Sequence, residues 1–154
     1  MVLTIFLLNL EDVVNYYANV NIYDNVKSFS FYKSKKSKFM YSISASFYDS
    51  KEYTYYFGYL RNGNKFLIER KNDSVFLFIN DNLVSSSPEE IPTISPYRMF
   101  IYLYQNNFPY TVKLDNGKYS VRFYTEDKNF LFLIDQNYRI LKYVPPSTFE
   151  IIFE

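Results

Sequence analysis

The sequence predicts a mainly β domain, an open antiparallel half-barrel of about ten strands with an N-terminal helix and a central helix covering its concave face. Three observations lead to this prediction. Apolar residues alternate with polar ones over most of the chain, which is typical of strands with one buried face. Turn-length segments separate these runs, which favours antiparallel neighbours. Only two stretches have helical spacing, so a sheet this wide must curl, with two helices to cover it. The length of 154 residues predicts one domain, 1–154.

The N-terminal segment contains a short apolar run and then a helix signal. Residues 2–8 are too few to span a bilayer, and two interpretations stay open: the remnant of a signal peptide that begins upstream, or the first core element. Asn9 is predicted to cap a helix over about Leu10–Val20. Leu10, Val13, Val14 and Tyr17 would form its apolar face.

The period then changes to two, and about five strands are predicted before the second helix. The clearest is Phe39–Tyr48, apolar on one face and largely serine on the other. Asn62-Gly63 is the strongest short hairpin signal in the chain. The remaining strands of this group are predicted at Phe29–Phe31, Tyr53–Tyr59, Phe66–Glu69 and Val75–Ile79, with a short extension at Leu83–Val84.

The middle of the chain predicts a loop, a helix and a second group of strands. Ser85–Pro92 reads as a loop by composition and is the only candidate for a lid. Ser95 caps a helix that has Pro96 at its first position and extends to about Gln105. About five further strands are predicted at Tyr110–Leu114, Tyr119–Phe123, Phe130–Ile134, Tyr138–Val144 and Phe149–Phe153.

The composition excludes several kinds of chemistry. The chain has no Cys and no His, so it has no disulfide, no thiolate metal site and no Ser-His-Asp triad. Three Gly cannot supply a dinucleotide-binding or P-loop fingerprint, and a net charge of +1 argues against nucleic-acid binding. A basic cluster beside aromatic strands can form a platform for stacking nucleic-acid bases, and here it consists of Lys33, Lys35, Lys36 and Lys38. Hairpin turns are also often rich in lysine, because lysine protects sheet edges from pairing. We therefore expect no enzyme activity, no cofactor and no nucleic-acid partner.

Charged residues give no convincing catalytic pair. Most carboxylates lie in predicted turns, where they are usually turn formers. Glu69, Arg70, Arg122 and Arg139 lie inside predicted strands instead, and we expect such side chains to face solvent.

The aromatic content allows an apolar cavity. Tyr and Phe make up 34 of the 154 residues, and a curled sheet with aromatic inner positions can enclose a ligand. Candidate wall residues are Phe39, Tyr41, Ile43, Phe47, Tyr55, Phe57, Phe66, Ile68, Phe76 and Phe78, and candidate plug residues on the second helix are Met99, Phe100 and Leu103. The alternative is that the same residues fill a solid core.

Several strings in order resemble the bacterial lipoprotein-localisation carrier superfamily, LolA and LolB. The opening helix is followed by Val26–Phe31, which resembles the family's early strand, and Phe66–Arg70 and Val75–Leu83 resemble later strands. Pro96–Gln105 matches the central helix in position, and Thr148–Phe153 resembles the closing strand. The resemblance covers roughly Leu10–Phe153 and implies a half-barrel that holds acyl chains without catalysis.

The chain departs from that family at a basic element. Only Arg61 and Lys65 stand near the turn where carriers have a basic residue followed by proline, and there is no Trp. The resemblance therefore implies a diverged binder of a lipid acyl chain or lipoprotein, in transient contact with a membrane or membrane protein. It implies an envelope or periplasmic location if a signal peptide lies upstream, and a cytoplasmic one otherwise. The alternative function is a structural or protein-interaction β module, for example a viral or surface protein.

Overall fold

The computed structural model describes residues 8–34, 37–88, 91–146 and 149–153, with side chains except at residues 31–34, 37–43 and Phe149. The apolar run 2–8 therefore lies almost wholly outside the described residues. The elements in order are α1 (Leu10–Tyr17), β1 (Ile22–Ser34), β2 (Ser37–Asp49), β3 (Tyr53–Leu60), β4 (Lys65–Lys71), β5 (Ser74–Ile79), β6 (Asn82–Pro88), α2 (Pro96–Gln105), β7 (Tyr110–Asp115), β8 (Lys118–Thr125), β9 (Lys128–Ile134), β10 (Ile140–Val144) and β11 (Phe149–Phe153).

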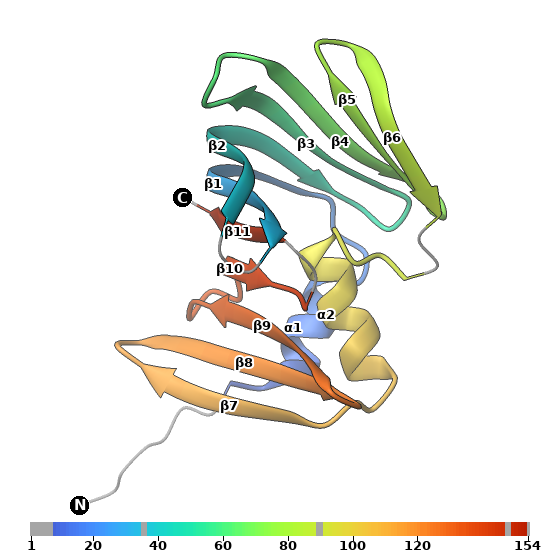
Figure 1. Ribbon diagram of the computed structural model, residues 1–154. Coiled ribbons are helices and arrows are strands. Elements are labelled where there is room, and N and C mark those ends of the chain that lie inside the picture. The colour runs from blue at the N-terminus through green and yellow to red at the C-terminus, as the bar shows by residue number, and fades with distance from the viewer. Residues whose placement is uncertain (1–7, 35–36, 89–90, 147–148, 154) are drawn as a thin grey trace, which may run out of the picture.

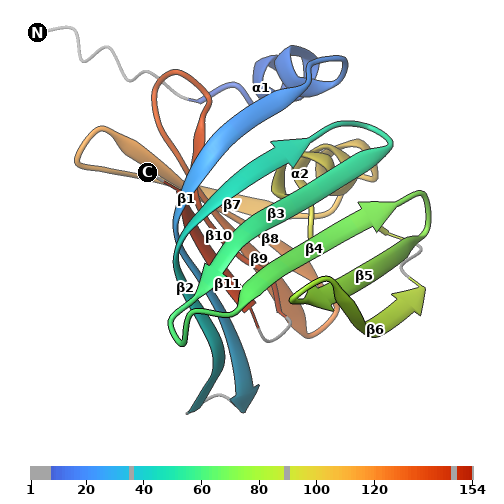
Figure 2. The same cartoon turned by 90° about the horizontal axis from the view of Figure 1, so that it is seen from above.

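The predicted fold class is confirmed. Eleven strands form one antiparallel sheet in the order β6-β5-β4-β3-β2-β1-β11-β10-β9-β8-β7. Two meanders, β1–β6 and β7–β11, are joined where the first strand pairs with the last, with Val26 opposite Phe153 and Phe29 opposite Ile151. The sheet curls around the two helices, which lie on its concave side, and β6 and β7 remain as the two edges (Figures 1 and 2). The result is an open half-barrel.

Both helices begin at the predicted caps. The Asn9 side chain accepts a hydrogen bond from the Glu11 backbone N–H, and the Ser95 side chain accepts one from the Arg98 backbone N–H. α1 ends at Tyr17 rather than at Val20. The carbonyls of Ala18 and Val20 instead accept hydrogen bonds from the Arg98 guanidinium, which joins the end of α1 to the start of α2.

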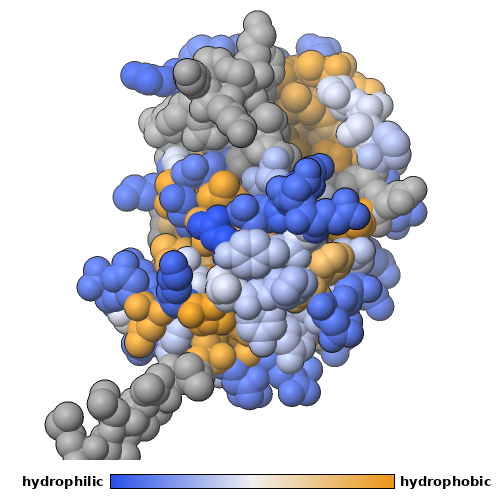
Figure 3. Space-filling view, turned by 60° about the horizontal axis from the view of Figure 1, so that its bottom comes forward, coloured by the Kyte–Doolittle hydropathy of each residue, from blue (hydrophilic) through white to orange (hydrophobic). Residues whose placement is uncertain are grey.

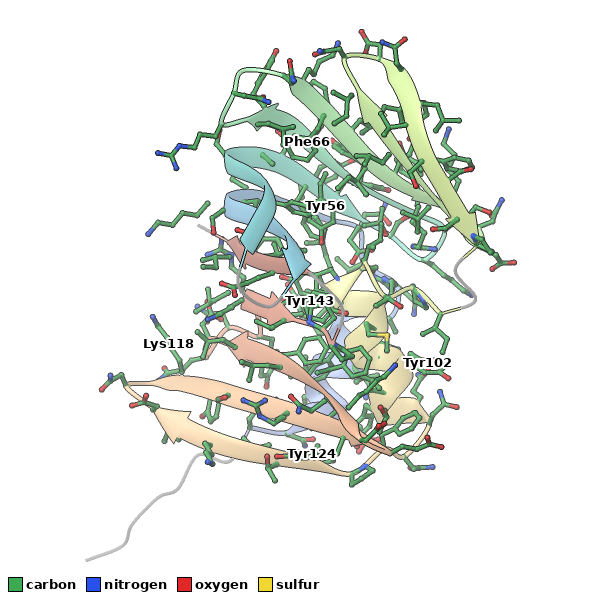
Figure 4. All side chains as sticks on the ribbon, in the orientation of Figure 1. Tyr56, Phe66, Tyr102, Lys118, Tyr124 and Tyr143 are labelled. Carbon is green, nitrogen blue, oxygen red and sulfur yellow. The ribbon has the colours of Figure 1, made fainter. Side chains whose placement is uncertain are left out.

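Aromatic rings fill the space between sheet and helices. On the β1–β6 side the Tyr56 ring lies 5.0 Å from the rings of both Phe29 and Phe47, measured between centroids. On the β7–β11 side Phe132 lies 5.0 Å from Tyr143. Tyr56, Phe66 and Tyr143 all point into this interior (Figure 4), and each is 0% exposed. The concave face of the half-barrel is thus largely a packed core, the alternative to an open cavity.

One predicted loop proved to be largely strand. Ser85–Pro88 continues β6 and pairs with β5, with Leu77 opposite Ser85 and Ser74 opposite Pro88. The prediction of a lid over Ser85–Pro92 is therefore wrong for its first half. Composition failed here because β6 is an edge strand, whose side chains are all exposed and so need not be apolar.

At Gly58 the backbones of the paired strands β3 and β2 approach each other unusually closely. A Cβ added there would lie 2.5 Å from the Ser44 carbonyl oxygen and 3.0 Å from the Ala45 Cα. Both are backbone atoms, so the strands would have to move apart. We expect Gly58→Ala to lower the free energy of unfolding by about 1–3 kcal/mol in urea titrations, as overpacking does. Ser46→Ala, at an exposed position on β2, is the control and should change it little; equal stability of Gly58→Ala and wild type would contradict the close approach.

Candidate binding site

The structure separates the predicted cavity wall into two faces of the sheet. Phe47, Phe66 and Ile68 lie buried on the concave face, at 1%, 0% and 2% exposure. Four others lie on the outer face: Tyr55, Phe57, Phe76 and Phe78. The prediction that these four share a face with Phe66 is wrong. The side chains of Phe39, Tyr41 and Ile43 are outside the described residues.

The turn after β3 explains the error for Tyr55 and Phe57. A two-residue turn at Asn62-Gly63 would pair Arg61 with Asn64 and set Phe57 on the face of Ile68. Instead the Leu60 N–H donates to the Asn64 carbonyl, and Gly63 adopts a φ of +91°, as in a three-residue loop. This shifts the register by one residue, which moves every β3 side chain to the other face. Tyr56, opposite Ile68, takes the inner position that sequence analysis assigned to its neighbours.

All three predicted plug residues lie on the buried face of α2. Met99, Phe100 and Leu103 are 3%, 1% and 0% exposed. Phe100 contacts Phe123 of β8 and Phe132 of β9 edge-on, with centroid distances of 5.3 and 5.1 Å. The Phe100 ring therefore packs against the second meander.

A pocket of about 370 Å³ opens between α2 and the β8–β9 turn. We call it the α2 pocket. Its residues are Ile91, Met99, Tyr102, Leu103, Phe108, Thr125, Glu126, Asp127, Lys128 and Phe130. Its wall is mainly apolar and its charged groups come from the turn, so the pocket pairs an apolar interior with a charged rim. Tyr102 lies on α2 (Figure 4), and its ring is 6.3 Å from that of Phe108, which also lines the pocket.

One face of the molecule is amphipathic. Seen from below, it is a mosaic in which orange apolar patches lie between strongly hydrophilic groups (Figure 3). Within the described part of the chain no helix is long and apolar enough to cross a membrane.

A buried polar network fixes the N-terminal end of α2 on the sheet. Both oxygens of the fully buried Asp49 carboxylate accept hydrogen bonds, at 2.5 Å from the Ser95 hydroxyl and at 3.0 Å from the Thr54 hydroxyl. The Arg70 guanidinium in turn donates to Thr54 Oγ1 at 3.1 Å. Arg98 Nε lies 3.9 Å from Asp49 Oδ1 and has no hydrogen-bond partner. The network places two cations near one buried carboxylate.

Burial raises the pKa of Asp49 to about 6. The hydrogen bond from Ser95 and the charge of Arg98 have the opposite, smaller effect and lower this pKa. Burial likewise lowers the pKa of Arg98 from its ordinary value. These shifts arise from a structural contact between helix and sheet, and in the described residues no group of three His, Cys, Asp or Glu side chains could hold a metal ion.

Tyrosine hydroxyls extend the same attachment. Tyr56 donates to the Ile94 carbonyl at 2.8 Å and Tyr143 donates to the Thr93 carbonyl at 2.6 Å. Tyr97 accepts from the Ile140 backbone N–H at 3.1 Å. Hydrogen bonds thus tie the start of α2 to both meanders, whereas the C-terminal half of the helix borders the α2 pocket.

The four charged residues that the sequence placed inside strands fall into two groups. The expectation that they face solvent is wrong for Glu69 and Arg70, which are 6% and 4% exposed. Arg70 lies inside the network, and Glu69 is buried on the outer face, where it accepts a hydrogen bond from the Tyr53 hydroxyl at 2.6 Å. Arg122 and Arg139 are partly exposed, and Arg139 forms a two-point ion pair with Asp24 at 2.8 and 2.9 Å. Alternation could not reveal the first two, because their partners lie far apart in sequence.

The fold and the pocket define a half-barrel with an apolar recess beside its central helix. No protein-family model matches the chain, and no curated protein matches it by sequence.

Proposed function

We propose that the protein is a non-enzymatic binder of a lipid acyl chain, either free or on a lipoprotein, and that the α2 pocket receives it. The observation that supports this most is the apolar wall of a pocket that opens at the concave side of a half-barrel. Its volume of about 370 Å³ falls in the range of ligand pockets, roughly 300–1,000 Å³. Each methylene buried there would contribute about 0.8 kcal/mol.

The rim is polar, as the opening of a pocket for an amphipathic molecule would be, and it carries Glu126 and Asp127 beside Lys128. Lys128 is exposed at the β8–β9 turn and supplies a cation for a carboxylate or phosphate head group, while the partly exposed Tyr102 and Phe108 contact the chain. Release would follow a displacement of the C-terminal half of α2, since the N-terminal half is tied to the sheet. The filled core beneath the helix limits the site to this recess unless α2 moves.

The test is native mass spectrometry of the freshly purified protein, followed by displacement of a fluorescent fatty acid by dodecanoate. We expect a bound mass that disappears on solvent extraction, and uptake of the probe with one site per chain. Thr125→Trp should fill the pocket and weaken probe binding about tenfold or more, which is a loss of about 1.4 kcal/mol. Thr111→Trp, the same change on the exposed strand β7, is the matched control and should bind as wild type does.

A charge reversal tests the head-group contact separately. Lys128→Glu should weaken dodecanoate binding several-fold, because a carboxylate head group would then meet three acidic side chains at the rim. Lys118 lies at the end of the β7–β8 hairpin that is far from α2 (Figure 4), so Lys118→Glu is the control and should have no effect. A ligand-free mass together with no probe uptake would overturn the proposal.

A second candidate, a protein-interaction module, is favoured by the edge strand β6. All seven of its residues are exposed and none is charged, although charges usually protect such edges. The other edge, β7, carries Lys113 and Asp115. In the same mass spectrum a ligand-free dimer would support this candidate over the acyl-chain binder.

A further inference from the structure

The outer face of the first meander carries a row of tyrosines. Tyr23, Tyr48 and Tyr55 lie opposite one another on β1, β2 and β3. The centroid distance is 4.7 Å between the first two rings and 5.7 Å between the last two. Tyr23 is 75% exposed. Rings that core packing does not need are therefore held in a row on a rigid sheet.

A hollow of about 300 Å³ lies on this face beside that row. We call it the outer hollow. Phe57 and Tyr59 of β3 flank it, while the short side chains of Asn25, Ser44 and Ser46 line the adjoining part on β1 and β2. Below these, β1–β3 close the hollow at Val26, Ala45 and Gly58. Phe57 and Tyr59 are 37% and 58% exposed, and their rings lie edge-on to each other with a centroid distance of 6.4 Å.

The chemistry of this lining is specific. It combines aromatic rings with hydroxyl and amide groups, and none of the lining residues that the structure describes is charged. Pyranose rings with equatorial substituents expose flat faces of axial C–H bonds, which pack on aromatic rings, and an equatorial edge of hydroxyls, which pair with Ser and Asn side chains. An anionic ligand would find no cation in the lining.

The size also favours a small ligand over a protein. Each partner in a specific protein interface contributes roughly 20–30 residues, whereas eight described residues line this hollow. Its volume lies at the lower end of the range for small-ligand pockets.

We propose that the outer hollow binds a neutral glycan of β-linked, equatorially substituted pyranose residues, with Phe57 and Tyr59 as the stacking rings and Asn25 and Ser46 as hydrogen-bonding partners. This site lies on the convex face and is separate from the α2 pocket, so it is independent of the acyl-chain proposal.

Cellotriose and chitotriose are the probes, titrated to tens of millimolar into the ¹⁵N-labelled full chain and followed by amide chemical shifts. We expect saturable shifts confined to β1–β3 around Asn25, Ser46 and Tyr59. Tyr59→Ala should raise the Kd about tenfold, as expected for the loss of one stacking ring together with its hydroxyl. Tyr124→Ala removes another exposed tyrosine ring, on β8, and should leave the Kd unchanged (Figure 4).

A second variant blocks the hollow without removing a ring. Ser46 is exposed on β2, and Trp is well tolerated in strands, so Ser46→Trp should fold normally and abolish the shifts. The absence of shifts with both sugars, shifts spread over other faces, or equal affinity in Ser46→Trp and wild type would overturn the proposal. Association of this face with a second copy, seen as a mass that rises with concentration and falls in Tyr59→Ala, would overturn it in favour of a protein partner.

Discussion

Replacing Phe100 by alanine is expected to lower the free energy of unfolding by about 3–5 kcal/mol, the range for a large buried aromatic residue. The side chain is 1% exposed and contacts Phe123 and Phe132 edge-on, so its removal leaves a cavity between helix and sheet. Neither neighbouring ring is free to fill this space, because both project from paired strands. Since small domains are stable by about 5–15 kcal/mol, this single change removes a large part of the total.

Urea unfolding followed by far-UV circular dichroism measures this loss. Gln105→Ala, at the exposed end of the same helix, is the control and should stay within about 0.5 kcal/mol of wild type. A loss below about 1 kcal/mol for Phe100→Ala would mean that α2 does not contribute to the core, and the description of the plug would then be wrong.

The elements of the fold were accessible from the sequence because local signals determine them. Asn9 and Ser95 cap the helices as expected, and alternation located most of the strands, although it missed most of the exposed edge strand β6. The pairing of β1 with β11 had no such signal, since Phe29 and Ile151 are neighbours only after both meanders have formed. Their contact is set by tertiary packing, which a single sequence does not display.

The candidate site was less predictable for a related reason. On β3 both faces are aromatic, with Tyr56 on one and Tyr55 and Phe57 on the other, so a period of two does not tell which face is buried. A loop one residue longer than the Asn-Gly signal implied decided the register. The polar network was also unforeseen, because Asp49 and Ser95 are separated by 46 positions and each is unremarkable alone.

Asp49 should make the stability of the protein depend on pH in an unusual direction. Its pKa is about 6 in the folded state, above the ordinary value of 3.8 that applies to the unfolded chain. Between these values the folded protein holds a proton that the unfolded chain has lost, so stability falls as pH rises. A difference of about two pKa units corresponds to roughly 3 kcal/mol, present below about pH 4 and lost as the pH passes about 6.

The variant Asp49→Asn isolates this contribution, because asparagine has nearly the same shape as the protonated acid and does not titrate. We expect the free energy of unfolding of Asp49→Asn to rise relative to wild type by about 3 kcal/mol between about pH 4 and about pH 7, in urea titrations at matched ionic strength. Whatever the amide costs in its hydrogen bonds to Ser95 and Thr54 is the same at each pH, so the trend alone reports the carboxylate. Asp73→Asn, at an exposed turn, is the matched control and should not reproduce the trend. The difference between wild type and Asp49→Asn could instead be constant with pH or change in the opposite direction. Either result would mean that the charges of Arg98 and Arg70 outweigh the cost of burying the Asp49 carboxylate, and that the ion pairs in the network stabilise the attachment of α2.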